Sequence, residues 1–213
     1  MSFIRRIFPR SVLSPIGIDM GSRVIKAVQL ITNRATSQAS VIASAAVLRN
    51  HLDDPFAPQD VLRLVQVMAR RGFKGRDVVL AAPSSRLESD IVELPARSSG
   101  APVDELAAAE IARVTKLEPL SYQAACWDVP VARQGAGAGT SMHAVTLRPA
   151  ADAALAAPFD LAGQRVRALE PAGCALARAS DDVDKASIVA LLDLGWRGGT
   201  VNLISEGDVL YQR

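Results

Sequence analysis

Near its start the chain carries an acidic, glycine-bearing turn between two apolar segments, and this turn constrains the fold more than any other feature. Residues 15–31 read PIGIDMGSRVIKAVQLI, with Ile16 and Ile18 before Asp19 and Gly21. Alternating apolar residues on both sides of a tight turn predict a β-hairpin. A Rossmann unit begins β-α-β, so this start excludes one.

The segments after the hairpin extend it to a predicted β-β-β-α-β unit over residues 16–83. Residues 40–48, which read SVIASAAVL, suit a third strand of the same meander. Residues 58–72 carry apolar side chains at i, i+3, i+4 and i+7, which is the pattern of one helix face. Residues 77–83 form a short apolar run that ends at a proline, as a buried strand would.

The middle of the chain predicts a strand at 91–95, a helix at 102–117 and a hairpin. The helix has acidic residues early and basic residues late, which matches its dipole. The hairpin joins 126–131 to 142–147 around the flexible segment QGAGAGT. Those glycines do not form a phosphate loop of the Walker type, because no Gly-Lys-Ser/Thr follows and no helix opens there.

The last third of the chain repeats the motif of the first hairpin. A helix over 150–163 and a strand over 166–169 lead through Glu-Pro into a second helix. An apolar strand then ends in Asp193-x-Gly195, and further strands follow up to residue 213. A strand meander needs partners to bury its face, so this second half is expected to continue beyond the residues given.

Each Asp-x-Gly turn has residues suited to a metal-bound polyphosphate. Glycine lets backbone N–H groups approach an anion closely, and a concave run of amides binds phosphate. The carboxylates of Asp19 and Asp193 can hold Mg²⁺, usually through water. Lys26 lies on the return strand, where its ammonium can reach a phosphate oxygen. One such turn is a common hairpin; two of them predict a polyphosphate site.

Composition narrows the classes of function. The chain has 24 basic and 22 acidic residues and a net charge of +2, which gives no strong field for nucleic acid. Aromatic residues make up only 4%, which argues against platforms that stack bases. Cys126 and Cys174 form no metal-binding pattern and are expected to be reduced and mostly buried. Residues 1–14 are expected to be an N-terminal arm, and no run of 18 apolar residues is present.

The segment IGIDMGSRVIKAVQL resembles the first phosphate loop of the superfamily that unites actin, the heat-shock ATPases and the sugar kinases, Asp-x-Gly-x-x-x-x-Lys. Within it, the chain is most similar to the PilM family, the actin-like component of type IV pilus machinery. The family-specific likeness lies in AAPSSRLESDIVELPA before an acidic helix and in EPAGCALARA. The second phosphate loop resembles LLDLG, followed by a strand pair that ends in VLYQR.

This resemblance implies a mixed α/β, actin-like fold in its FtsA-like variant. Subdomain 1A would comprise 15–83 and 164–180, the inserted subdomain 1C 84–150, and the start of subdomain 2A 187–213. The last of these would be incomplete. ATP with Mg²⁺ would lie between the halves.

By position in the motif, the cofactor-binding residues would be Asp19, Gly21, Ser22, Lys26, Asp193 and Gly195, with Asp19 and Asp193 toward the metal. No catalytic residue is implied, and any ATPase activity would be weak. The partner would be the cytoplasmic tail of a PilN-like inner-membrane protein, which would keep the chain in the cytoplasm at that membrane. Self-association is a further expectation, and nucleic acid is not expected as a partner.

Other interpretations stay open from the sequence. One is a shortened metabolite kinase of the same superfamily; others are a nucleotide-free scaffold and a GspL-like secretion component. The second loop departs from the family pattern, since Trp196 follows Gly195 where a small residue is usual and Thr200 comes late. An indole at this place could crowd a triphosphate.

Overall fold

A computed structural model describes residues 11–52, 57–116, 118, 122–129, 139–180 and 188–213. Compactness divides the chain into two units, one of residues 1–80 with 158–168 and one of residues 81–157 with 169–213. The predicted subdomain limits stay a prediction. Most of the predicted N-terminal arm lies outside the described residues, and the first strand already begins at Ser11.

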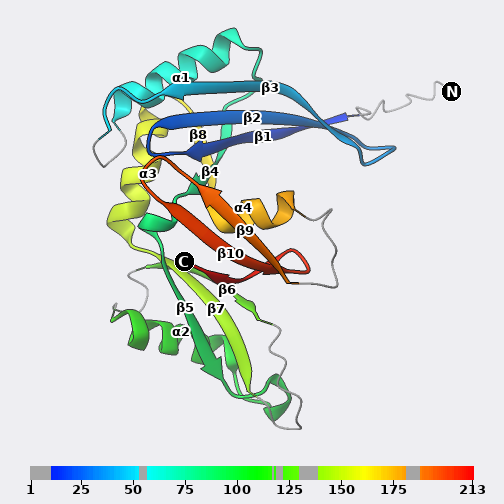
Figure 1. The fold of residues 1–213 in the computed structure, drawn as a ribbon, viewed down its shortest axis with the longest axis vertical. Coiled ribbons are helices and arrows are strands. Elements are labelled where there is room, and N and C mark those ends of the chain that lie inside the picture. The colour runs from blue at the N-terminus through cyan, green and yellow to red at the C-terminus, as the bar shows by residue number, and fades with distance from the viewer. Residues whose placement is uncertain (1–10, 53–56, 117, 119–121, 130–138, 181–187) are drawn as a thin grey trace, which may run out of the picture. The chain divides into compact units, whose positions relative to one another are not determined.

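The predicted β-β-β-α-β order is confirmed (Figure 1). A five-stranded sheet has the order β3-β2-β1-β4-β8, and β1, β2 and β3 pair antiparallel. Its strands and the two longer helices next to them in sequence are β1 (Ser11–Met20), β2 (Val24–Asn33), β3 (Ala39–Leu48), α1 (Pro58–Arg70), β4 (Asp77–Ala82), α3 (Pro149–Leu161) and β8 (Arg165–Pro171).

The core of the first unit follows from the alternation seen in the sequence. Ile16 and Ile18 of β1 and Ile25 of β2 are almost fully buried, while Asp19 and Lys26, which alternate with them, are exposed. Val61 and Leu64 of α1 are fully buried as well, as the helical spacing predicts. A strand period and a helix period therefore supply two apolar faces that cover each other.

One buried amide fixes the meander to the loop before β4. Gln29 on β2 is 1% exposed, and its Nε2 donates to the carbonyls of Ser14, at 3.0 Å, and Lys74, at 2.8 Å. Its Oε1 accepts the N–H of Lys74 at 2.8 Å. Both ends of the side chain are satisfied, which is the condition under which a buried amide is tolerated.

The second unit contains an antiparallel sheet of order β5-β7-β6, formed by β5 (Glu88–Leu94), β6 (Gln123–Asp128) and β7 (Thr140–Leu147). Helix α2 (Val103–Thr115) packs its buried Ala107 and Ile111 against one face of this sheet. The predicted pairing of the strands around the glycine-rich segment is confirmed. Residues 130–138 of that segment lie outside the described residues. Short 3₁₀ turns at Ser84–Arg86 and Arg97–Ser99 flank β5.

The second predicted meander is also confirmed. Strands β9 (Val189–Leu194), β10 (Gly199–Ser205) and β11 (Asp208–Gln212) form an antiparallel sheet of order β11-β10-β9. Glu206 and Gly207, with φ of 54° and 87°, make the tight turn between β10 and β11. Helix α4 (Ala172–Ala179) packs on this sheet through a small cluster with Ala177 at its centre.

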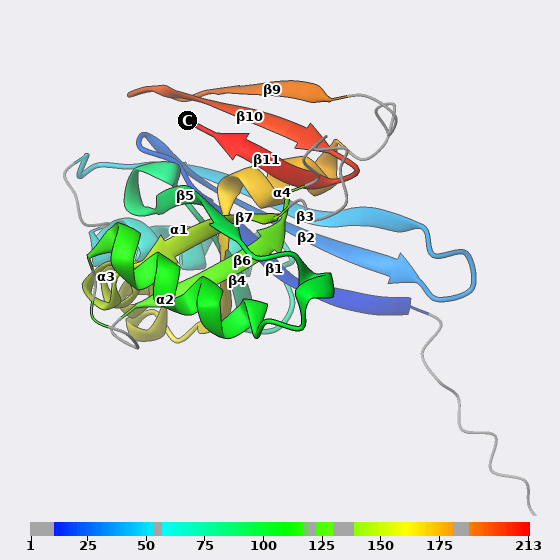
Figure 2. The same ribbon diagram turned by 90° about the horizontal axis from the view of Figure 1, so that it is seen from below.

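The two sheets of the second unit are joined through one main-chain carbonyl. The indole N–H of Trp127 donates to the carbonyl of Val209 at 2.8 Å, and Nδ1 of His143 lies 3.0 Å from the same oxygen. The two rings pack against each other with centroids 4.8 Å apart. Figure 2 shows α2 on one side of the β5-β7-β6 sheet and the β9-β10-β11 sheet on the other.

Candidate functional site

The first Asp-x-Gly turn lies between β1 and β2, and the register pairs Asp19 directly with Lys26. Lys26 Nζ lies 2.7 Å from Asp19 Oδ2, and the side chains are 61% and 50% exposed. The structure thus brings the predicted metal ligand and the predicted phosphate-binding cation together on one face of the hairpin. An exposed pair of this kind contributes about 0–1 kcal/mol, so its two charges can separate to meet other ions.

Gly21 is required by the geometry of this turn. A Cβ at this position would lie 2.5 Å from the carbonyl oxygen of Val24, a distance that no side chain tolerates. The turn can therefore close only around a residue without a side chain. Ser22 follows in the turn, where it is half-buried.

A buried ion pair that the sequence did not reveal supports the first turn. Asp60 is 0% exposed, and its carboxylate accepts the N–H groups of Asn50, at 3.0 Å, and His51, at 3.2 Å. Arg49 lies beside it, with Nε 3.9 Å from Asp60 Oδ2. Arg49 Nη1 donates to the carbonyl of Ser22 at 3.2 Å, and its backbone N–H donates to the carbonyl of Arg23 at 2.8 Å. The carbonyls of the turn are thus held from the side of β3.

The second Asp-x-Gly turn lies between β9 and β10. Asp193 faces Thr200 across the hairpin, and both Asp193 and Gly195 are exposed. The N–H of Gly195 donates to the carbonyl of Gly198 at 2.8 Å, which closes the turn. Thr200 Oγ1 lies 3.0 Å from the hydroxyl oxygen of Ser84. The threonine that comes late in the sequence is therefore opposite the acid in space.

The two predicted phosphate loops belong to different compact units. Their opposition across one cleft stays a prediction, as do the roles of Asp19 and Asp193 toward Mg²⁺. Trp196, whose sequence position suggested crowding, is 65% exposed. Among the described residues, no group of three or more His, Cys, Asp or Glu side chains is arranged to hold a metal ion.

A second candidate site is a pocket of about 180 Å³ inside the second unit. Its walls come from β6 and β7, and its ends come from Leu87 and from Glu170 and Pro171 at the end of β8. Both segments that carry the family-specific part of the sequence likeness, 81–96 and 170–179, thus contribute to it. The lining is mostly apolar, with Gln123, Thr146 and Glu170 as polar groups. Such a surface suits the side chains of a short peptide better than a highly charged molecule.

The pKa values of the buried thiols and of the buried imidazole in the second unit suit structural roles. Burial raises the pKa of the Cys174 thiol to about 11 and also raises the pKa of Cys126. Both cysteines are free, and at neutral pH both are protonated, so neither is an activated nucleophile. Burial lowers the pKa of His143, which is therefore neutral at pH 7. None of these groups lies in either Asp-x-Gly turn.

Within the described part of the chain, no helix is long and apolar enough to cross a membrane.

Comparison with known proteins places the fold. No family model matches the sequence, and no curated protein matches it. Among solved structures, the chain is similar to the PilM-PilN type IV pilus biogenesis complex, with a TM-score of 0.73 and 17% identity over 93% of this chain and 60% of that chain. It is also similar to the cytoplasmic domain of EpsL, an inner membrane component of the type II secretion system of Vibrio cholerae. Here the TM-score is 0.54, with 13% identity over 94% of this chain and 70% of that chain.

At these identities the likeness concerns the fold. The predicted mixed α/β fold is confirmed, and its arrangement is similar to that of the PilM-PilN structure. The chain spans 60% of the length of the matched chain of the PilM-PilN complex. Functions carried by the part of that chain outside the match are not functions of the residues that this structure describes.

Proposed function

We propose that this chain is an actin-like scaffold component of type IV pilus assembly, which binds ATP with Mg²⁺ and the cytoplasmic tail of a PilN-like inner-membrane protein. It would act in the cytoplasm at the inner membrane, held there by its partners. Hydrolysis of ATP is at most weak in this account, and the nucleotide acts as a conformational ligand.

The observation that carries the proposal is the repeated meander. In both units the first strand of an antiparallel three-stranded meander ends in Asp-x-Gly, and the acid is the second-last paired residue of that strand, at Asp19 and at Asp193. Strand orders β3-β2-β1 and β11-β10-β9 repeat in the same sense. A duplicated acidic glycine turn supports one loop on each side of a polyphosphate chain.

The pocket along β6 supports the peptide-binding part of the proposal. Its lining is mostly apolar, and it is bounded by segments that the sequence assigned to subdomains 1A and 1C. The matched structure is a complex of PilM with PilN, so a PilN-like tail is the occupant we propose. The tail would lie extended, with apolar side chains toward Ala125, Val145 and Leu169.

Capture of a tail peptide tests this partner. The probe is a synthetic peptide with the cytoplasmic N-terminal sequence of a PilN-like inner-membrane protein from the same organism. We expect the full chain to bind it and Ala125→Arg, which places a long cation in the pocket, to lose binding at least about tenfold. Ala150→Arg is the matched control, because Ala150 is exposed and does not line the pocket. Equal binding by both variants would rule out this pocket.

The likeness to EpsL favours one other candidate, an assembly component of a type II secretion system. The same capture experiment separates the two, with a cytoplasmic tail from a type II secretion membrane protein as the second probe. Preference for the secretion tail would replace the pilus assignment and leave the fold unchanged.

A further inference from the structure

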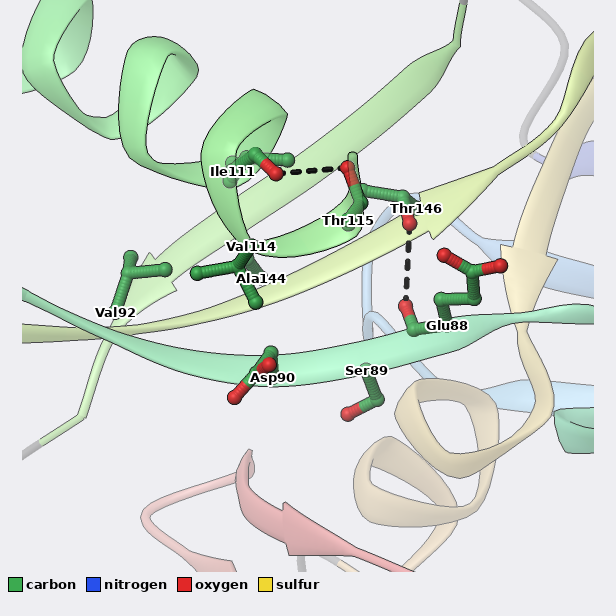
Figure 3. A pocket seen from close by; sticks show the side chains of 9 residues that line it. All are labelled: Glu88, Ser89, Asp90, Val92, Ile111, Val114, Thr115, Ala144 and Thr146. Atoms are coloured by element: carbon green, nitrogen blue, oxygen red, sulfur yellow. Dashed lines mark hydrogen bonds between the residues drawn. The ribbon is translucent and has the colours of Figure 1, made fainter. Parts of the chain in front are cut away.

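Strand β5 forms one edge of the β5-β7-β6 sheet, and a pocket opens beside it. The pocket has a volume of about 100 Å³. Its floor is apolar, from Val92, Ala144, Ile111 and Val114, and Glu88 and Asp90 of β5 are among its other lining residues (Figure 3). One side of β5 pairs with β7; in the described part of the sheet, no strand pairs with the other side.

The backbone of β5 presents hydrogen-bonding groups along this outer edge. The N–H of Val129 donates to the carbonyl of Ser141 at 2.8 Å, so by antiparallel alternation the peptide groups of Met142 face β5 and those of Val92 face β7. The peptide groups of Ile91, one residue earlier, therefore point outward. Consistent with this, the N–H of Ile91 donates to Asp90 Oδ1 at 2.8 Å.

The charge of this edge selects the kind of strand that can join it. Strand β5 reads ESDIVEL, with three acidic residues and no basic one. Glu88 is paired with Arg148 at 2.6 Å, and Glu93 accepts a hydrogen bond from Ser141 at 2.9 Å. Asp90 instead covers the N–H of its neighbour. A second copy of this strand would bring like charges together, which is unfavourable, whereas a basic strand would not.

We propose that the outer edge of β5 and its pocket dock an extended, basic segment of a partner protein by strand addition. A carbonyl of the segment accepts the N–H of Ile91, which releases the carboxylate of Asp90. A Lys or Arg of the segment then pairs with Asp90. An apolar side chain two residues away lies on the same face of the added strand and enters the pocket beside Val92 and Val114.

This docking surface is separate from the pocket along β6, and the inference does not depend on ATP binding. The two pockets share Thr146 of β7 as a lining residue, but the edge offered for strand addition is that of β5, whereas the other pocket lies along β6 on the far side of β7. Their occupants also differ in chemistry, because the β6 pocket is mostly apolar whereas the β5 edge requires a cation.

The test uses two nine-residue peptides, blocked at both ends, with threonine at every odd position. One alternates leucine and lysine at the even positions; the other replaces lysine with glutamate. We expect the lysine peptide to bind the full chain and to shift the amide resonance of Ile91, and the glutamate peptide to bind at least about tenfold more weakly. The shift of Ile91 reports strand addition directly.

Variants separate the two contacts. Asp90→Lys should weaken the lysine peptide at least about tenfold, whereas Asp160→Lys, the same charge change at an exposed residue of α3, should not. Val114→Phe fills the pocket and should weaken binding without moving the free Ile91 resonance. Circular dichroism establishes that each variant is folded. No binding of the lysine peptide, equal binding of both peptides, or shifts confined to β6 would overturn the proposal.

Discussion

The two Asp-x-Gly hairpins have the same strand order but very different support. At the first, Asp19 is ion-paired with Lys26 at 2.7 Å, and a buried Arg49 holds the turn from behind. At the second, Asp193 is exposed and forms no ion pair with any residue in the described part of the chain. Leu192 and Leu194 beside it are 58% and 76% exposed. The first turn is built into a core, whereas the second closes mainly on itself.

This difference determines how firmly the peptide groups of each turn are held before any ligand binds. In the first hairpin, carbonyls of the turn are already engaged by Arg49, so the direction of the peptide groups is set before any ligand binds. In the second, the bond from Gly195 to Gly198 fixes the turn locally, and Thr200 contacts the hydroxyl of Ser84 outside the hairpin. We expect the first loop to be rigid without nucleotide and the second to order further on binding.

The largest effect should follow from removing the buried carboxylate. Asp60→Ala leaves the buried guanidinium of Arg49 without its counter-ion and two N–H groups without an acceptor. Breaking one side of a buried pair costs about 3–5 kcal/mol. Urea unfolding should show this loss, whereas Asp193→Ala should change the free energy of unfolding by less than about 0.5 kcal/mol. Equal losses would contradict the contrast between the hairpins.

Substitution of the turn glycine should also destabilise the first hairpin more than the second. At Gly21 an added Cβ would lie 2.5 Å from the Val24 carbonyl oxygen, while at Gly195 it would lie 3.1 Å from the Gly198 carbonyl oxygen. We expect Gly21→Ala to cost about 1–3 kcal/mol through forced backbone movement, and Gly195→Ala clearly less. Thermal denaturation of both variants at one pH gives the comparison, and a larger loss for Gly195→Ala would reverse it.

Mild acid should weaken the second unit through His143. Burial lowers the pKa of this histidine from its ordinary value of 6.5, while the unfolded chain keeps the ordinary value. As pH falls below about 6.5, the unfolded state gains a proton that the folded state refuses, so stability falls. The melting temperature at pH 5.5 should lie below that at pH 7.5, and His143→Asn should reduce this difference.

Three carboxyl groups with arginine partners lose their contribution to stability only at lower pH. Arginine partners hold the pKa values of Asp77, Glu110 and Asp128 below their ordinary range, so the stability that these groups contribute is present at neutral pH. It is lost only as pH falls through their folded values, below about pH 4. A wild-type melting temperature that is unchanged between pH 7.5 and 5.5 would contradict the assignment to His143.

The smallest effect on stability should come from the exposed ion pair. Lys26→Met removes the charge that pairs with Asp19 at the mouth of the first hairpin, where both side chains are at least half exposed. Such pairs contribute about 0–1 kcal/mol, and raising the salt concentration should reduce the difference between variant and wild type. A loss as large as that of Asp60→Ala would show that the pair is structural and not available to a ligand.

Much of this fold could be predicted because its signals are local. The hairpin around Asp19, the helix of apolar spacing at 58–72 and the second turn at Asp193 each follow from a run of fewer than twenty residues. The role of Asp60 could not be predicted in this way. From the sequence it suits the start of a helix, yet in the structure its carboxylate accepts N–H groups of residues 50 and 51 and supports Arg49.

The remaining contacts join residues far apart in the chain, and no periodicity reports them. Trp127 reaches Val209 across 82 positions, and Thr200 reaches Ser84 across 116. Likewise, the sequence predicts Lys26 as a phosphate contact, but the register that places it opposite Asp19 depends on where the turn closes. The sequence does not predict edge strands either, because β5 becomes an edge only when β7 pairs with it on one side and with β6 on the other.

Isothermal titration of the full chain with ATP and Mg²⁺ tests the central claim most directly. The account predicts saturable binding that depends on Mg²⁺ and is weakened at least about tenfold by Asp19→Ala and by Asp193→Ala, each in a folded protein. Asp160→Ala, the control on an exposed helix position, should bind as the wild type does. Binding that survives both turn substitutions, or no binding at millimolar nucleotide, would contradict the claim that these two turns form a phosphate site.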